Sequence, residues 1–401
     1  MFRASSALLA TATVALAGCT PTMTLSVAPE TPESLAQIAL PALATEPQNP
    51  TEPISVDVRD GVLTNVELRG PGGDLQGILA EDGSSWTWAG SPLEYGSQYQ
   101  ISATAIDYQG RPTSQDLDFT TVEPSKFFRA EISPSNGESV GVGMPITVNF
   151  TKKVTDRAAV EAALEVQTPT PVYGAWAWTN DRTVEFRPQD LWPGDMPVVV
   201  RANLAGVEAQ PGVFGRENTE AAFTFRPSVV SVVDADTHTM EVFRAGELIN
   251  TIPITTGKPG FETRSGTKVL LSKERVRVMD AATGGTSLDD PEYYRVEAPY
   301  AMRMTYSGEF VHGAPWSVAS QGRDNVSHGC VGMSVSNAEW WWNENNIGDV
   351  VIVKNTSVTQ TNDGNGLTVW NEPWNEWLSR SATGAHFTTT RAQAEAVTSE
   401  A

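Results

Sequence analysis

A pair of tryptophans recurs along the chain and limits its fold more than any other feature. Trp86-Thr87-Trp88 returns as Trp176-Ala177-Trp178, and each pair precedes a stretch in which apolar and polar residues alternate, 99–106 and 197–204. Alternation with period two is typical of strands that bury one face. A repeat of this length, filled with short strands, predicts two small β-sandwiches in tandem.

We therefore expect a mainly β protein: two immunoglobulin-like β-sandwich domains followed by a β-rich domain with few short helices. The paired tryptophans would pack inside the sandwiches, and a glycan contact is the alternative. The expected boundaries are 1–18 signal peptide, 19–53 Pro/Ala/Thr/Glu-rich tether, 54–124 and 125–225 sandwiches, 226–355 third domain, 356–379 Trp-rich subdomain docked on a neighbour, and 380–401 disordered tail.

Within the third domain, residues 229–233, 240–243, 248–254, 269–272, 300–306 and 350–354 read as strands. The Gly-, Thr- and Asp-rich residues 280–292 predict a mobile flap. Ser336 and Glu339 fit a capping box, which predicts a short helix through three tryptophans to about Asn345.

The charge of the chain excludes one class of partner. It has 27 basic and 48 acidic residues in 401, a formal net charge of −21. Nucleic-acid binding requires a basic surface, so we expect no such partner. Hydrophobic residues make up 40% of the chain, which is enough for sizeable cores.

The N-terminus has the pattern of an export signal. Arg3 precedes an apolar run at residues 7–17, which is too short to span a bilayer. Leu16-Ala17-Gly18-Cys19 then resembles the bacterial lipobox, whose cysteine carries a diacylglycerol. An ordinary cleaved signal peptide is the alternative. If Cys19 is acylated, Cys330 has no disulfide partner in an oxidising compartment, so this thiol needs another reason to be present.

Two histidines precede Cys330 in the same part of the sequence. His328 stands two residues before it, and His312 ends an expected strand at 309–312. An imidazole can take the proton of a thiol and so activate it for attack on a carbonyl. The glycines beside Cys330 would let backbone N–H groups approach an oxyanion. The residues alone leave two alternatives open: a zinc site made by His312, His328 and Cys330, or purely structural roles.

The motif around these residues resembles the signature of L,D-transpeptidases, the peptidoglycan cross-linking enzymes with the YkuD catalytic domain. It consists of His312-Gly313-Ala314-Pro315-Trp316-Ser317, then Gln321-Gly322, then Asn325-Val326-Ser327-His328-Gly329-Cys330. The flanks at 304–308 and 334–340 match as well, and the likeness is greatest to actinobacterial lipoproteins with two immunoglobulin-like domains.

The resemblance implies a role for each matching residue. Cys330 is the nucleophile and His312 its general base, while Ser327, His328 and Gly329 shape the loop and the oxyanion hole. The implied substrate positions are Tyr294, Ser307, Gly308 and Asn325. The alternatives are structural roles: an aromatic of the flap for Tyr294, a turn for Ser307 and Gly308, and a loop hydrogen bond for Asn325.

The implied reaction is acyl transfer without metal or cofactor. Peptidoglycan stem peptides would be the substrates, and the enzyme would be exported and lipid-anchored through Cys19 at the outer leaflet of the cytoplasmic membrane, facing the wall. An L,D-carboxypeptidase with water as acceptor and a non-catalytic wall-binding lipoprotein are the alternatives. Two positions depart from the family pattern: Gly332 stands where relatives have Asn or Arg, and Gly313 where many have Ser or Ala.

Overall fold

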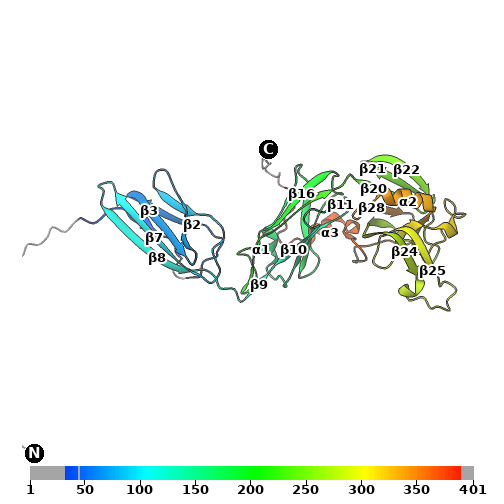
Figure 1. The fold of residues 1–401 in the computed structure, drawn as a ribbon, viewed down its shortest axis with the longest axis horizontal. Coiled ribbons are helices and arrows are strands. Elements are labelled where there is room, and N and C mark those ends of the chain that lie inside the picture. The colour runs from blue at the N-terminus through cyan, green and yellow to red at the C-terminus, as the bar shows by residue number, and fades with distance from the viewer. Residues whose placement is uncertain (1–31, 44–45, 390–401) are drawn as a thin grey trace, which may run out of the picture. The chain divides into compact units, whose positions relative to one another are not determined.

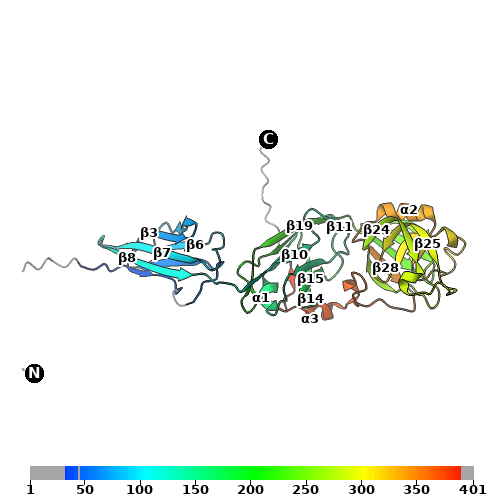
Figure 2. The same cartoon turned by 60° about the horizontal axis from the view of Figure 1, so that its bottom comes forward.

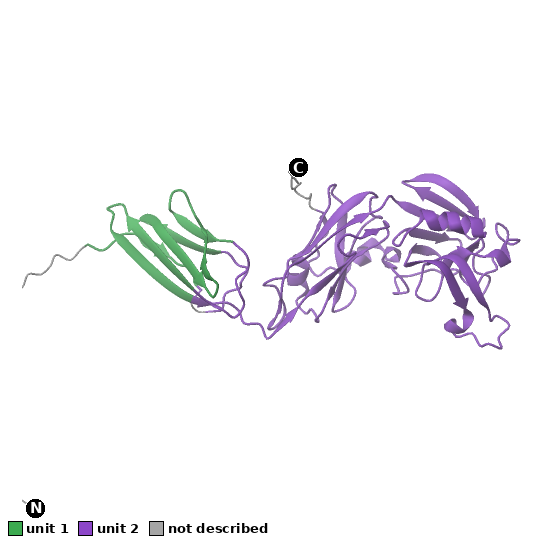
Figure 3. Cartoon of the chain, in the orientation of Figure 1, with its two compact units in different colours: residues 1–42, 54–89, 100–118 green, residues 43–53, 90–99, 119–401 purple. Residues whose placement is uncertain are grey.

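The computed structural model describes residues 32–43 and 46–389. The predicted signal peptide at 1–18, the lipobox Cys19 and the last residues of the predicted tail, 390–401, lie outside these ranges. The described chain forms two compact units. The first holds the described residues up to 42 together with 54–89 and 100–118, and the second holds the remaining described residues (Figure 3). Strands dominate both units, as expected from the sequence (Figure 1).

Unit 1 contains two four-stranded sheets, most of whose strands appear in blue and cyan in Figure 1. In spatial order the first holds β1 (Gln37–Ala39), β2 (Ile54–Arg59), β6 (Ser85–Trp88) and β5 (Ile78–Leu79), and the second holds β4 (Gly73–Leu75), β3 (Gly61–Gly70), β7 (Gln98–Asp107) and β8 (Pro112–Thr120). Every second residue of β2 is buried, as a sandwich strand requires. Because β1 pairs with β2, part of the segment predicted as a tether belongs to this sheet.

A second sandwich opens unit 2. Its five-stranded sheet has the order β10 (Ala130–Ser133), β12 (Ile146–Phe150), β15 (Thr183–Pro188), β14 (Tyr173–Trp178) and β29 (Phe387–Thr388); its four-stranded sheet has β11 (Ser139–Val140), β19 (Thr219–Phe225), β16 (Met196–Ala202) and β13 (Leu164–Gln167). A small sheet of β17 (Glu208–Gln210), β18 (Val213–Gly215) and β9 (Lys126–Phe128) and the helix α1 (Arg157–Ala162) complete it.

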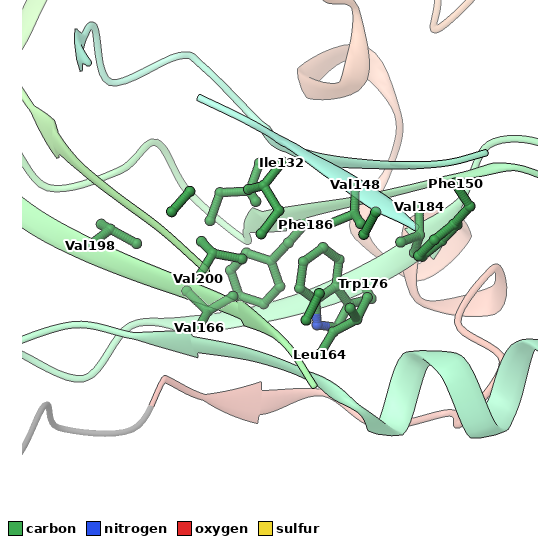
Figure 4. Packing of buried hydrophobic residues seen from close by; sticks show 14 of the residues in the cluster. Ile132, Val148, Phe150, Leu164, Val166, Trp176, Val184, Phe186, Val198 and Val200 are labelled. Atoms are coloured by element: carbon green, nitrogen blue, oxygen red, sulfur yellow. The ribbon is translucent and has the colours of Figure 1, made fainter. Parts of the chain in front are cut away.

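Side chains from both sheets interleave in the core of this sandwich around Trp176 and Phe186 (Figure 4). The two rings meet edge to face with their centroids 5.3 Å apart. Trp86, the counterpart of Trp176 in the repeat, is buried in unit 1, and Trp178 is buried as well. The expectation that the repeated tryptophans are core residues is therefore confirmed for these three, while Trp88 is half-buried.

The rest of unit 2 carries two further sheets. One has the order β22 (Glu247–Pro253), β21 (Thr239–Arg244), β20 (Val229–Asp234), β28 (Val350–Lys354) and β23 (Gly266–Val269); the other has β24 (Ser272–Asp280), β25 (Arg295–Arg303), β26 (Phe310–Gly313) and β27 (Val331–Met333). Six of the expected strands appear here, including the one at 309–312 as β26, although the strand expected at 300–306 ends at Arg303. The stretch 269–272, predicted as one strand, is instead the junction between β23 and β24.

Helix α2 (Val335–Glu344) packs against β25 and β26 and is drawn in orange in Figure 2. Trp341 ties it to the other sheet, because its indole N–H donates to the Ser231 hydroxyl on β20 at 2.8 Å. The helix was predicted, but its capping residue was wrong. Ser334 caps it by accepting a hydrogen bond from the Asn337 amide. Glu339 instead accepts a hydrogen bond from the Tyr300 hydroxyl at 2.6 Å.

The segment after β28 returns to the second sandwich, through η3 (Val369–Asn371) and α3 (Trp374–Ser379). Trp377 is fully buried and its indole N–H donates to the Ala175 carbonyl on β14 at 3.0 Å. Arg187 of β15 lies against three tryptophan rings of this segment, with its guanidinium carbon 4.7 Å from the ring centroid of Trp377. The expected docking of the Trp-rich segment is thus observed on the second sandwich.

The expectation that residues 380–401 are disordered is wrong for 380–389. The buried carboxylate of Glu161 accepts hydrogen bonds from the Ala382 amide at 2.8 Å and the Thr383 hydroxyl at 2.6 Å. Strand β29 then adds to the edge of β14. A buried carboxylate needs such donors, which explains why this segment is held in place.

Within the described residues, no helix is long and apolar enough to cross a membrane.

Candidate active site

Cys330 and His312 face one cavity of about 360 Å³ in the β24–β27 sheet. Its walls are formed by Thr255, Met279, Tyr294, Val296, His312, Ala314, Trp316, Ser317, Ser320, Val326, Ser327, His328, Cys330 and Gly332. Strands β26 and β27 run parallel, with His312 opposite Gly332. Cys330 comes directly before β27 and lines the same cavity as His312. The topology thus brings together two residues that are separate in sequence.

The imidazole of His312 is held in one orientation. It is 4% exposed, and its Nδ1 lies 2.9 Å from the carbonyl oxygen of Gly313. A carbonyl can only accept, so Nδ1 carries the proton and Nε2 keeps its lone pair. Burial lowers the pKa of His312, although the hydrogen bond to Gly313 opposes this shift. His312 is therefore neutral at pH 7 and has an acceptor nitrogen for a proton from the cavity.

The Cys330 thiol is protonated in this state. It is 7% exposed, and its Sγ donates to the Gly308 carbonyl oxygen at 3.7 Å. Burial raises the pKa of Cys330 to about 12, and the Glu309 carboxylate adds to this shift. The Phe310 amide and the charge of Arg303 lower the pKa of Cys330. A free thiol has a pKa near 8.5, so this thiol needs a base at the moment of reaction.

The loop before Cys330 is closed on itself by Ser327. The Ser327 hydroxyl donates to the Cys330 carbonyl at 2.6 Å and accepts from the Gly329 amide at 3.2 Å. Gly329 has φ +112°, a conformation that side chains disfavour. In this state the Gly329 N–H is bound to the Ser327 hydroxyl, and the expected role of this loop as an oxyanion hole stays a prediction.

His328 points to a different set of partners. Its Nε2 lies 2.7 Å from a carboxylate oxygen of Glu292, which also accepts from the Lys258 ammonium at 2.5 Å. Its ring lies between Phe261 and Tyr294, with centroids 4.7 and 4.8 Å away. Hydrogen bonds from Lys258 and then His328 lower the pKa of Glu292. His328 thus ties its loop to the segment between β24 and β25, which was predicted as a flap.

The alternative of a zinc site finds no matching geometry. In residues 32–43 and 46–389, no three His, Cys, Asp or Glu side chains converge as metal ligands would. His328 is paired with Glu292, whereas His312 and Cys330 bond to backbone carbonyls.

Three of the four expected substrate positions line a cavity. Tyr294 belongs to the first cavity and also to a second one of about 430 Å³, which Ser307 and Gly308 line as well. Asn325 does not line either of them. Its amide donates to the Ala235 carbonyl, and its side-chain oxygen accepts from the Thr256 amide and from Nδ1 of His238. Asn325 therefore fixes the loop to the β20–β21 turn.

Gly332 lines the first cavity and has no side chain there. A Cβ there would lie 3.0 Å from the Ala314 Cβ and 3.1 Å from Thr255 Cγ2. These neighbours would have to move by a few tenths of an ångström to admit one. Backbone hydrogen bonds between Gly332 and Thr255, both 2.9 Å long, keep the strand in place without a side chain.

Sequence reasoning missed a buried ionic network beside the thiol. Glu309 accepts from Lys268 Nζ at 2.7 Å with one oxygen and from Arg264 Nη1 at 3.0 Å with the other. Glu309 and Lys268 are almost fully buried. The Ser307 amide also donates to Asn365, a residue of the C-terminal segment. No local pattern marks these partners, although a Lys and a Glu within otherwise apolar strands are a weak signal for such a pair.

Comparison with known proteins gives matches over both halves of the chain. The family model "Bacterial Ig domain" matches residues 45–208, and the model "L,D-transpeptidase catalytic domain" matches residues 228–353. L,D-transpeptidase 2 of Mycobacterium tuberculosis is 37% identical over 331 residues, which span 82% of this chain and 81% of that protein. L,D-transpeptidase 5 of the same species is 30% identical over 83% of this chain and 74% of its own length.

A solved structure of the LD transpeptidase LdtMt1 in complex with imipenem is also similar. It is 39% identical, covers 56% of this chain and 98% of that chain, and has a TM-score of 0.49.

Proposed function

The chain belongs to the L,D-transpeptidase family, and from this premise we propose that it forms 3-3 cross-links in peptidoglycan with Cys330 as nucleophile and His312 as base. The observation that carries the proposal is the protonation pattern of the pair. Nδ1 of His312 is fixed on the Gly313 carbonyl, so Nε2 is the atom that accepts a proton, and Cys330 faces the same cavity.

The first half-reaction consumes the donor stem. His312 Nε2 takes the thiol proton while Sγ attacks the carbonyl between the L-centre of diaminopimelate and the terminal D-Ala. The oxyanion develops against the backbone N–H groups of His328 and Cys330, and against that of Gly329 once it has left the Ser327 hydroxyl. The imidazolium then returns its proton to the departing amine, D-Ala leaves, and a thioester remains on Cys330.

The second half-reaction resolves the thioester. The side-chain amine of a second stem attacks, gives its proton to His312, and expels the Cys330 thiolate, which recovers the proton. Water in place of this amine would give hydrolysis, the carboxypeptidase alternative. The ratio of cross-linked dimer to tripeptide, formed from disaccharide tetrapeptide, separates the two activities.

The site assignment is tested by intact-mass measurement after incubation with imipenem. We expect one covalent adduct on the wild type and none on Cys330→Ser. Cys19→Ser is the matched control, because it removes the other cysteine of the chain and leaves the cavity untouched. An adduct that persists on a folded Cys330→Ser, or a wild type that forms no cross-linked dimer, contradicts the proposal.

We also propose that Cys19 is diacylated and holds the enzyme at the outer face of the cytoplasmic membrane. The support is the sequence Leu16-Ala17-Gly18-Cys19 after a short apolar run. Two acyl chains give stable attachment, whereas one gives only marginal binding. Cys19→Ser is expected to move the protein out of the membrane fraction; unchanged fractionation of that variant would contradict the anchor.

A further inference from the structure

The second cavity carries positive charge in an otherwise acidic protein. Arg277 and Arg303 line it together with Tyr306, Ser307 and Gly308. Both guanidinium groups lie over the ring of Phe310, with Cζ to centroid distances of 5.9 Å for Arg277 and 4.5 Å for Arg303. The chain as a whole has a net charge of −21, so two arginines converging on one cavity are an exception to its charge pattern.

Arg303 is held by two backbone carbonyls and has no counter-ion among residues 32–43 and 46–389. Its Nη1 donates to the carbonyl oxygens of Thr305 and Tyr306, each at 3.1 Å. Among the described residues it takes part in no ion pair, and its Nε and Nη2 donate to no other group. These two nitrogens form the edge of a guanidinium that binds a carboxylate in bidentate fashion.

The other charged groups of the cavity are already partly neutralised. Arg277 pairs with Glu274 at 3.3 Å on the surface, where such pairs are weak. Asp280 pairs with Arg295 at 3.5 Å and accepts a hydrogen bond from the Ala282 amide. The uncompensated charge at this site therefore belongs to Arg303.

The cavity also adjoins the reacting atom. Gly308, which lines it, accepts the hydrogen bond of the Cys330 thiol. An anion held by Arg303 would thus belong to the part of a substrate close to the attacked carbonyl. The positive charge would also raise the local concentration of an anionic substrate against the negative field of the rest of the protein.

We propose that the second cavity binds a carboxylate of the donor stem, with Arg303 as its principal ligand. This inference rests on the proposed function and names the chemistry that one side of the site recognises. The donor carries such a group on its terminal D-Ala, next to the scissile amide, and another at the far end of its diaminopimelate side chain.

Binding to the inactive Cys330→Ala variant tests the inference without turnover. Titration calorimetry compares the free tetrapeptide, its D-alaninamide, its side-chain amide and the doubly amidated peptide, with and without Arg303→Gln. Hydrogen bonds to charged groups predict that Arg303→Gln weakens the free peptide about 10- to 100-fold and leaves the doubly amidated peptide unchanged. Of the two singly amidated peptides, the one whose affinity no longer depends on Arg303 lacks the carboxylate that Arg303 binds, and so identifies it.

Arg275→Gln is the matched control. It removes one positive charge from β24, but Arg275 is exposed, stacks on Tyr300 and does not line the cavity. Cys330→Ala with Arg275→Gln is expected to bind each peptide as tightly as Cys330→Ala alone. Equal losses for the free and the doubly amidated peptide on Arg303→Gln, or no loss for either, overturn the inference.

Failure of the proposed function would show differently, as a wild type that binds the peptides but neither releases D-Ala nor forms dimer.

Discussion

Two carboxylate–cation clusters flank Cys330, and they differ chiefly in burial. On the strand side, the buried Glu309 joins the buried Lys268 and the partly exposed Arg264, and it stands on the same chain segment as His312. On the flap side, Glu292 joins Lys258 and His328 near the surface, with 40% of the Glu292 side chain exposed. The same kind of ion pair is therefore buried on the strand side and accessible to solvent on the flap side. The cluster of Glu292, Lys258 and His328 is called the clasp below.

The histidines follow the same division. His312 is buried and hydrogen-bonded only to a neutral carbonyl, whereas His328 shares a carboxylate with Lys258. A general base needs a free lone pair. The hydrogen bond from Nδ1 to the Gly313 carbonyl leaves that lone pair on Nε2 of His312, which is why we propose His312 as the base. His328 is thus nearer to Cys330 in the sequence than His312 is, but this nearness does not indicate its role.

The largest expected effect is on the strand side, at His312. His312→Ala should slow acylation by imipenem at pH 7 about 10²- to 10⁴-fold, the usual contribution of a general base. Stopped-flow fluorescence measures the rate. His386→Ala is the control, because His386 meets Tyr173 of the second sandwich edge to face, away from the cavity. A loss of less than about fivefold would place the base elsewhere.

The next effect is on stability. Glu309→Gln leaves the buried Lys268 ammonium without its carboxylate, which typically costs about 3–5 kcal/mol. Denaturant unfolding of wild type and variant measures the loss. The double variant Lys268→Met/Glu309→Leu removes both charges and should recover much of it; a double variant no more stable than Glu309→Gln would argue against an unpaired buried charge as the cause.

A smaller effect is expected on the flap side, at His328. His328→Ala removes two ring contacts and the bond to Glu292, so acylation should slow about tenfold. His328→Phe keeps the ring packing and should lose less than about fivefold. If both variants slow acylation as much as His312→Ala does, the contrast between the two sides is wrong.

The smallest effect is expected for Glu292→Gln. Exposed ion pairs contribute little, so acylation should change by less than about fivefold at pH 7. Because Lys258 lowers the pKa of Glu292, the clasp is present above the ordinary carboxyl pKa of about 4.3 and is lost as pH falls through the lowered value. Amide exchange of residues 281–294 should therefore resemble that of the variant only in acid. Equal exchange at pH 7 would contradict a clasp.

Local sequence patterns predicted the strands and the motif of the site. They did not predict the contacts between residues that are far apart in the sequence. The apolar run at β28 and the turn at Ala245-Gly246, where both residues have positive φ, are local signals. The docking of residues 381–383 on Glu161 is not, because the partners are over 200 positions apart. Asn325 matched a family substrate position, yet its hydrogen bonds to His238 and Ala235 depend on tertiary structure.

The pKa of Cys330 shows the same limit. From the sequence alone, a cysteine thiol is assigned its ordinary pKa near 8.5. In the folded protein, burial raises the pKa of Cys330 to about 12. Burial of this kind depends on Phe310 and Met279, which come from other strands and pack in the same apolar cluster.

The pH dependence of acylation tests most directly whether neutral His312 withdraws the proton of a neutral Cys330 thiol. Imipenem acylation of wild type, His312→Ala and His328→Ala is measured from about pH 5.5 to about pH 10. Because burial lowers the pKa of His312, the wild-type rate should stay level to below pH 6.5 and fall only as the imidazole is protonated. His312→Ala should gain about tenfold per pH unit and keep rising past pH 8.5, since the thiol pKa is about 12. His328→Ala should keep the wild-type shape; a wild-type profile for His312→Ala together with the steep alkaline rise in His328→Ala would contradict the account.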